Sequence, residues 1–122
     1  MLLDTYAWIE FFIGSEKGNV VNKILKNNIC YTSAISIAEI SEWVERGNYD
    51  RKKIFSDVES FSTIIDLDGS ILESAGIIKV KKRQKIKDFG MVDAIILATA
   101  KLHEMKIVTG DKHFNDENIV AL

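Results

Sequence analysis

The sequence predicts one α/β domain in three layers, α/β/α, built around a short-stranded and mainly parallel sheet. Two observations support this fold class. Short apolar runs alternate along the 122 residues with longer amphipathic segments, a pattern typical of parallel sheets covered by helices on both faces. The chain has no proline, no internal repeat and no low-complexity linker, and its length suits a single core. We therefore expect one domain over residues 1–122.

The first half of the chain shows the alternation clearly. Residues 1–3 form an apolar run that stops at an aspartate, and an amphipathic helix is expected over 5–13. Two glycines follow, so the next helix is expected to begin only at residue 19 and to run to 26. Residues 29–32 are rich in β-branched and aromatic side chains, which favours a strand, and an apolar stripe predicts a helix over 34–46.

The second half repeats the pattern and includes the most apolar helix of the chain, which begins at residue 91. These patterns do not determine the strand order. We expect helices over 50–61, 70–87 and 91–103, and strands over 62–65, 106–109 and 118–122.

Charge is unevenly distributed along the chain. The net charge is −2, which argues against a general nucleic-acid coat protein. One short segment, residues 79–87, contains six basic residues and no acid. The rest of the chain holds 10 basic and 18 acidic residues, a net charge of −8. That segment is either an RNA-binding surface or a solvated helix end favoured by the helix dipole. We call it the basic stripe; it contains Lys79, Lys81, Lys82, Arg83, Lys85 and Lys87, and no acid.

The sequence also indicates where the protein works. Cys30 is the only cysteine, so no intramolecular disulfide can form, and we expect a buried apolar side chain there. The N-terminus lacks a basic region and a cleavage site, and no apolar run approaches membrane-spanning length. We expect a cytoplasmic protein with no membrane partner.

Four acidic residues stand at informative places. Asp4 and Asp111 each follow a predicted strand, and ligands bind at the carboxyl edge of parallel sheets, although either aspartate could instead cap a helix or a turn. Asp93 interrupts a helix that is apolar on nearly every side, where a carboxylate is costly unless it is paired, metal-bound or used as a cap after Gly90. Glu39 lies beside an apolar helical stripe, and its alternative is a solvated acidic face.

Carboxylates gathered at one edge repel each other and require a counter-charge. Since no histidine or cysteine is expected to converge with them, we predict Mg²⁺ or Mn²⁺ and not Zn²⁺. His103 and His113 match no zinc spacing and are expected on the surface or in packing roles.

Four strings in order over the chain resemble the PIN-domain ribonucleases, and among them the VapC-like toxins of toxin–antitoxin pairs. The strings are Leu2-Leu3-Asp4-Thr5, Ser36-Ile37-Ala38-Glu39-Ile40, Asp93-Ala94-Ile95-Ile96-Leu97-Ala98-Thr99-Ala100 and Ile107-Val108-Thr109-Gly110-Asp111-Lys112-His113-Phe114.

This resemblance implies a PIN-like fold and an endoribonuclease that hydrolyses RNA phosphodiester bonds with Mg²⁺ or Mn²⁺. It assigns the acidic quartet to Asp4, Glu39, Asp93 and Asp111, with Thr109 as a supporting hydroxyl and Asp116 as a further acid. It also implies a homodimer and a small antitoxin partner.

Two alternatives also fit the sequence. One is a catalytically silent PIN-like module that only binds a partner. The other is a receiver-like domain phosphorylated on Asp66 or Asp68, although the first strand then lacks the second acid that such a site needs.

Overall fold

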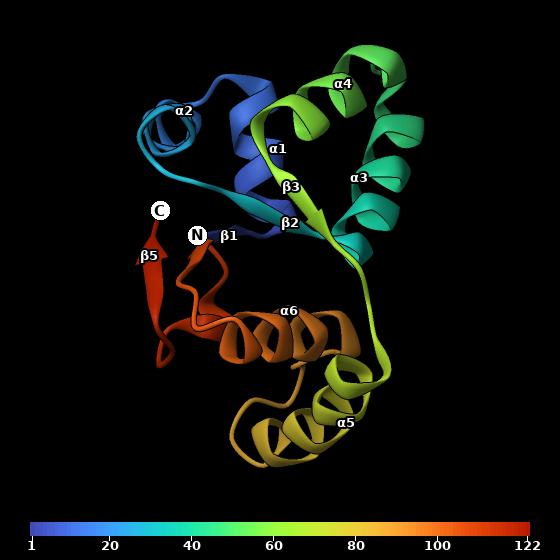
Figure 1. Ribbon diagram of the computed structural model, residues 1–122, viewed down its shortest axis with the longest axis vertical. Coiled ribbons are helices and arrows are strands. Elements are labelled where there is room, and N and C mark those ends of the chain that lie inside the picture. The colour runs from blue at the N-terminus through green and yellow to red at the C-terminus, as the bar shows by residue number, and fades with distance from the viewer.

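The computed structural model describes all residues 1–122 and contains one five-stranded sheet with helices on both faces (Figure 1). All strand pairs are parallel, so the predicted three-layer α/β/α fold is confirmed. The strands are β1 (Leu2–Leu3), β2 (Tyr31–Ser33), β3 (Thr63–Ile65), β4 (Ile107–Thr109) and β5 (Ile119–Ala121). The helices are α1 (Thr5–Ile13), α2 (Glu16–Asn27), α3 (Ala34–Gly47), α4 (Arg51–Phe61), α5 (Gly69–Arg83) and α6 (Met91–Leu102), with a 3-10 turn, η1 (Lys112–Phe114).

The two faces of the sheet bury two separate hydrophobic clusters. Successive residues of a strand point to opposite faces. Leu2 and Ile107 therefore pack with α5 and α6, whereas Leu3 and Val108 pack with α1, α2, α3 and α4. Figure 1 shows the two helical layers on either side of the sheet. All four of these side chains are buried, so the central strands are apolar on both faces.

Helix α2 begins earlier than the sequence indicated. Ser15 caps the helix by accepting a hydrogen bond from the backbone N–H of Gly18, and Gly18 lies inside the first turns. A Cβ at Gly18 would clash with the carbonyl oxygen of Glu10 in α1. This glycine therefore permits close packing of α1 on α2, and its interpretation as a helix breaker was wrong.

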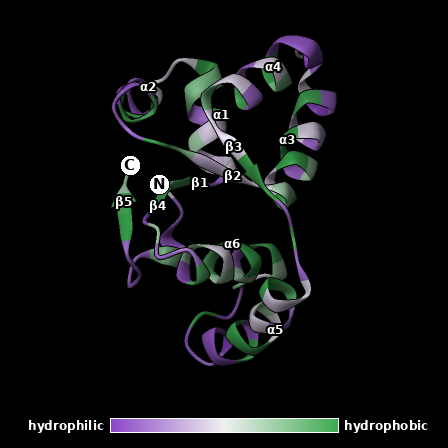
Figure 2. Cartoon of the chain, in the orientation of Figure 1, coloured by the Kyte–Doolittle hydropathy of each residue, from purple (hydrophilic) through white to green (hydrophobic).

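Helix α5 ends earlier than predicted, at Arg83 and not at residue 87. The chain leaves the helix there, which allows Ile86 and Phe89 to join the cluster on the α5 and α6 side. The guanidinium Nε of Arg83 donates to the carbonyl oxygen of Phe89 at 2.9 Å and fixes the connection to α6. Figure 2 shows hydrophilic residues gathered at this end of α5, so the basic stripe spans a helix end and the turn after it.

The strand order is β3-β2-β1-β4-β5. It differs from the 2-1-3-4-5 order of receiver-like domains, so the phosphoacceptor alternative is wrong. Asp68, one of its two candidate residues, instead caps α5 by accepting a hydrogen bond from the N–H of Ile71. Cys30 is buried, as expected. None of the helices is long and apolar enough to span a membrane.

Candidate metal centre

One pocket of about 150 Å³ brings together the four acidic side chains singled out in the sequence. Asp4 follows β1 and Asp111 lies two residues after β4, so both stand at the carboxyl edge of adjacent parallel strands. Glu39 reaches the pocket from α3, and Asp93 reaches it from the first turn of α6. The remaining lining residues are Thr5, Tyr6, Val92, Ile96 and Phe114.

Asp4 is the most buried of the four acids. Its Oδ1 accepts a hydrogen bond from the backbone N–H of Ala7 at 2.9 Å, which caps α1, and its Oδ2 accepts one from the Thr109 hydroxyl. Burial raises the pKa of Asp4 to about 7, and the negative charges of Asp111 and Glu39 add to the rise although both hydrogen bonds oppose it. A nearby positive charge would therefore favour the ionised form of Asp4 at neutral pH.

Thr109 supports two acids at once. Its hydroxyl donates to Asp4 and accepts a hydrogen bond from the backbone N–H of Asp111 at 2.9 Å. The side chain is buried at the end of β4. A hydroxyl in this place orients the loop that carries Asp111 as well as the carboxylate of Asp4.

Glu39 is oriented by a residue from another helix. The hydroxyl of Thr5, the first residue of α1, donates to Glu39 Oε1 at 2.5 Å. The other oxygen, Oε2, has no hydrogen-bond partner within the protein and is free for a ligand. The alternative interpretation of Glu39 as part of a solvated acidic face does not describe its position, since it lines the pocket.

Asp93 is both a helix cap and a pocket residue. Its Oδ2 accepts a hydrogen bond from the backbone N–H of Gly90 at 3.0 Å, as the capping alternative predicted. The same oxygen lies 2.9 Å from Nδ1 of His113. Capping thus fixes one oxygen of Asp93, and Oδ1 is left without a protein partner.

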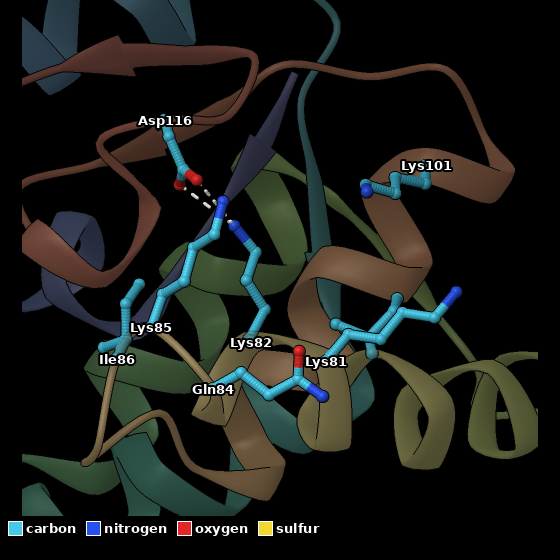
Figure 3. Close-up of a pocket in the computed structure, with 8 residues that line it drawn as sticks. Lys81, Lys82, Gln84, Lys85, Ile86, Lys101 and Asp116 are labelled. Carbon is cyan, nitrogen blue, oxygen red and sulfur yellow. Dashed lines mark hydrogen bonds and ion pairs between the residues drawn. The ribbon is translucent and has the colours of Figure 1, made fainter.

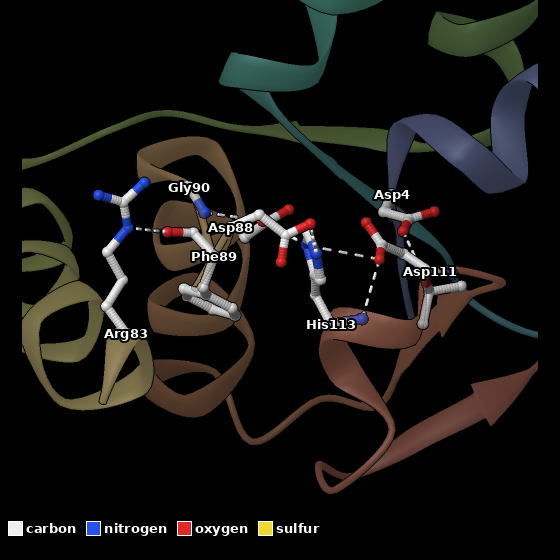
Figure 4. Close-up of polar contacts among 9 residues, drawn as sticks. Asp4, Arg83, Asp88, Phe89, Gly90, Asp111 and His113 are labelled. Atoms are coloured by element: carbon white, nitrogen blue, oxygen red, sulfur yellow. Dashed lines mark hydrogen bonds and ion pairs between the residues drawn. The ribbon is translucent and has the colours of Figure 1, made fainter. Parts of the chain in front are cut away.

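His113 lies among these acids, so its assignment to a surface or packing role was wrong (Figure 4). Its Nδ1 contacts Asp93, its Nε2 lies 3.1 Å from Asp88 Oδ2, and its backbone N–H donates to Asp111 Oδ1 at 2.9 Å. Partial burial alone would lower the pKa of His113, but the hydrogen bonds to Asp93 and Asp88 and the charge of Asp111 outweigh burial and raise it. An imidazole that donates from both nitrogens carries a positive charge.

Sequence reasoning missed His113 because its place depends on a local turn. Asp111 caps η1, and this tight turn directs the histidine two residues later back toward α6. The signal was present as an aspartate followed by histidine at i+2, but no metal-site spacing includes it. Tyr6 and Asp88 were also overlooked; Tyr6 lines the pocket and packs against Gly110.

Asp116 does not join the pocket. Its carboxylate is paired with Lys82 Nζ at 3.0 Å beside a larger hollow of about 600 Å³ at the end of α5 (Figure 3). Lys82 also pairs with Glu117 at 2.5 Å, and only 15% of its side chain is exposed. Lys82 and Arg83 are thus held by contacts within the protein, whereas Lys81, Lys85 and Lys87 are exposed and make no ion pair.

The donor set fits a divalent cation. Oxygen atoms of Asp93 and Asp111 and a ring nitrogen of His113 lie within 4.8 Å of one another. Carboxylate oxygens are the ligands that Mg²⁺ and Mn²⁺ prefer. A bound cation would also lower the raised pKa of Asp4 by favouring its ionised form. The expectation that no histidine lies near the acids must be corrected, although both nitrogens of His113 are already occupied by carboxylates.

Comparison with known proteins agrees with this fold. The family model of the PIN domain matches residues 1–117. No curated protein sequence matches the chain. Three solved structures illustrate the similarity over nearly the whole length. A toxin–antitoxin complex from Klebsiella pneumoniae has a chain with 26% identity and a TM-score of 0.76, with 98% of this chain and 95% of that chain covered.

Two further structures have lower identity and show the fold alone. VapBC2 from Rickettsia felis, bound to a DNA fragment from its promoter, has 21% identity and a TM-score of 0.75, with 99% of this chain and 96% of that chain covered. VapC20 from Mycobacterium tuberculosis, a sarcin-ricin loop cleaving toxin, has 16% identity and a TM-score of 0.76, with coverages of 99% and 97%.

Proposed function

We propose that this chain, which belongs to the PIN domain family, is a Mg²⁺- or Mn²⁺-dependent endoribonuclease and the toxin of a toxin–antitoxin pair. The observation that carries the proposal is the convergence of Asp4, Glu39, Asp93 and Asp111 on one pocket. Within the protein, only His113 offers these acids a positive charge, and it contacts Asp93 and Asp111 without lining the pocket. A divalent cation in the pocket would supply the missing charge.

Each acid has a distinct part in this proposal. Asp4 and Asp93 are the principal metal ligands, since backbone N–H groups hold both carboxylates in place. Asp111 is a ligand to a second ion or acts through water. Glu39, held by Thr5 through Oε1, either ligates the metal or orients the attacking water through Oε2.

The chemistry is hydrolysis of a phosphodiester bond. When bound, the divalent ion would polarise a phosphoryl oxygen and make a nearby water molecule more acidic. The protein contributes orientation: Thr5, Thr109 and Gly90 fix the carboxylates, so little reorganisation is needed when substrate binds. Water attacks phosphorus, and the bond to the leaving ribose oxygen breaks.

An acidic pocket repels the RNA backbone, so other residues must attract it. We assign this to the basic stripe, and within it to Lys79, Lys81, Lys85 and Lys87, because Lys82 and Arg83 are engaged inside the protein. The rest of the chain is at −8, so the stripe is its main source of attraction for a polyanion.

The toxin role is supported by the similarity to a chain of the toxin–antitoxin complex from Klebsiella pneumoniae. We propose a small antitoxin as partner, a homodimer, and action on RNA in the cytoplasm by a single domain over residues 1–122. Exposed apolar side chains on α5 and α6, at Ile77, Val80 and Leu102, provide a surface for a second copy. A short reading frame for a DNA-binding protein immediately upstream is the expected genomic context.

An RNA cleavage assay tests the proposed activity. Wild-type protein should cleave RNA with Mn²⁺ or Mg²⁺ and stop when EDTA is added, and Asp4→Asn and Glu39→Gln should lose about 10²-fold or more in rate. Glu42→Gln is the matched control, because Glu42 lies one turn from Glu39 but is exposed and paired with Arg46. Cleavage that survives EDTA or both pocket substitutions contradicts the assignment, and metal-independent RNA binding without cleavage supports a silent binding module.

A further inference from the structure

We propose that His113 is a positioning residue for the metal centre: it holds the carboxylate of Asp93 through Nδ1 and that of Asp111 through its backbone N–H, while Asp88 holds the imidazole ring. This inference rests on the proposed function of the acidic pocket. It concerns a residue that does not line the pocket itself, so it acts on the metal through its neighbours.

The carboxylate of Asp93 is held by two hydrogen bonds, one of them from His113. Its Oδ2 accepts hydrogen bonds from Gly90 N–H at 3.0 Å and from His113 Nδ1 at 2.9 Å. Two donors on one oxygen fix the rotation of the carboxylate about its terminal bond and leave Oδ1 free. Without His113, the single bond to Gly90 would permit that rotation, and the free oxygen would no longer have one direction.

The carboxylate of Asp111 is held by the backbone of His113. Its Oδ1 accepts the backbone N–H of His113 at 2.9 Å, and its own N–H donates to Thr109. The turn η1 therefore joins the acid at the end of β4 to the acid on α6 through one residue. Nδ1 of His113 lies 2.9 Å from Asp93 Oδ2 and 3.6 Å from Asp111 Oδ1, so His113 stands in contact with both carboxylates and sets their separation.

The ring of His113 is itself held on two sides. Asp88 Oδ2 lies 3.1 Å from Nε2, and the ring of buried Phe89 lies with its centroid 6.1 Å from that of His113. The connection carrying both residues is fixed by the hydrogen bond from Arg83 to the Phe89 carbonyl (Figure 4). Asp88 is 80% exposed, so its share of this support is the smaller one.

Two substitutions separate geometry from charge. The amide nitrogen of asparagine can occupy the place of imidazole Nδ1, and that of glutamine the place of Nε2. Both variants remove the same charge, so a difference between them shows whether the bond to Asp93 or the bond to Asp88 matters for the metal. His113→Asn keeps that bond and loses the one to Asp88, whereas His113→Gln does the reverse.

The test is Mn²⁺ affinity measured by calorimetry on the full chain, with thermal melting as the check on folding. His113→Gln should bind Mn²⁺ about 10- to 100-fold more weakly than wild type, as for other residues that orient metal ligands, and His113→Asn should stay within about threefold. Equal losses in the two variants, or no loss in His113→Gln, overturn the inference. If His113→Gln does not fold, His113→Ala replaces it, because alanine also lacks a donor for Asp93, and an affinity there equal to that of His113→Asn overturns the inference.

Two further measurements keep the outcomes apart. A nitrogen coupling from imidazole in the electron spin-echo spectrum of the Mn²⁺-loaded protein would make His113 a direct ligand and overturn the positioning role. Asp93→Asn is the reference for the site: if wild type binds Mn²⁺ and Asp93→Asn does not, the proposed centre stands whatever His113 does. If wild type binds no divalent ion, the proposed function fails and the inference with it.

Discussion

The Thr109 hydroxyl donates a hydrogen bond to Asp4 Oδ2 across 105 residues of chain. The bond joins the ends of the adjacent parallel strands β1 and β4, where both side chains are buried. It opposes the rise in the pKa of Asp4 that burial causes. The stability of the metal-free protein therefore depends on this pair.

Thr109→Val should destabilise the protein by about 1–3 kcal/mol, because it leaves a buried carboxylate oxygen and the N–H of Asp111 without their partner. Thr109→Ser keeps the hydroxyl and should lose much less unfolding free energy, so this variant is the control. Urea unfolding with EDTA present measures both. Equal losses in the two variants would attribute the effect to packing of the methyl group.

The metal-free protein should become less stable as pH rises from about 4 to about 7. The carboxyl of Asp4 has a pKa of 3.8 when unfolded and about 7 when folded, so in this window the folded state binds more protons and the free energy of unfolding falls as pH rises. The raised pKa of His113 acts in the same direction, because its contribution is complete below 6.5 and is lost as pH rises through the folded value.

Asp4→Asn should flatten this dependence, since asparagine cannot ionise and still caps α1. The measurement is the unfolding free energy across the pH series, with EDTA present throughout. A slope as steep in Asp4→Asn as in wild type would assign the dependence to other groups. Saturating Mn²⁺ should also reduce the slope in wild type, because a bound cation favours the ionised carboxylate.

Asp93→Asn should abolish RNA cleavage and change stability by no more than about 1 kcal/mol. Asparagine retains an oxygen that can accept from Gly90, and the loss of the bond to His113 is offset by relief of repulsion from Asp111. A cleavage assay and thermal melting without metal test the two halves. Retained cleavage with a large loss of stability would mean that Asp93 serves only as a helix cap.

The positions of the acids could be predicted because each is tied to a local pattern. Asp4 and Asp111 follow apolar strand sequences, and parallel strands present their carboxyl ends at one edge. Asp93 stands out in an apolar helix. The place of His113 could not be predicted, because it depends on the tight turn η1 and on a loop fixed by Arg83, and neither leaves a periodic signal.

The helices and strands also differ in what local sequence predicts and what tertiary packing determines. Their order and type follow from hydrophobic periodicity, whereas two boundaries depend on tertiary packing. Gly18 ended a helix in the sequence pattern but lies inside α2, since α1 packs against it. The end of α5 depends on burial of Ile86 and Phe89. The charged residues beside them in the sequence give no apolar pattern from which this burial could be predicted.

A pair of glycine substitutions checks this interpretation of α2. Gly18→Ala should destabilise the protein by about 1–3 kcal/mol through the clash with Glu10. Gly76→Ala in α5 has open space for its Cβ and should be neutral or stabilise the helix by up to about 1 kcal/mol. Chemical denaturation compares them, and a tolerated alanine at Gly18 would mean that α1 and α2 can separate without cost.

The basic stripe is expected to attract the RNA backbone. Replacing Lys79, Lys81, Lys85 and Lys87 by glutamine should weaken RNA binding and reduce its salt dependence by up to about three units of slope, at about 0.7 per phosphate contact on a single strand. Lys82 and Arg83 are left intact, because Lys82 pairs with Asp116 and Glu117 and Arg83 holds the loop before α6, so their loss would disturb the fold. Filter binding across a salt series in the Asp93→Asn background measures the slope without cleavage.

A matched variant separates the stripe from net charge. Lys23, Lys26, Lys52 and Lys106 are exposed, lie outside the stripe and make no ion pair, and their replacement by glutamine lowers the total charge by the same amount. If attraction depends on where the lysines lie, only the stripe variant loses slope, because screening confines each charge to about 10 Å at 0.1 M salt. Equal losses in the two variants would mean that overall charge governs RNA binding, and loss in neither would leave the stripe as a solvated helix end.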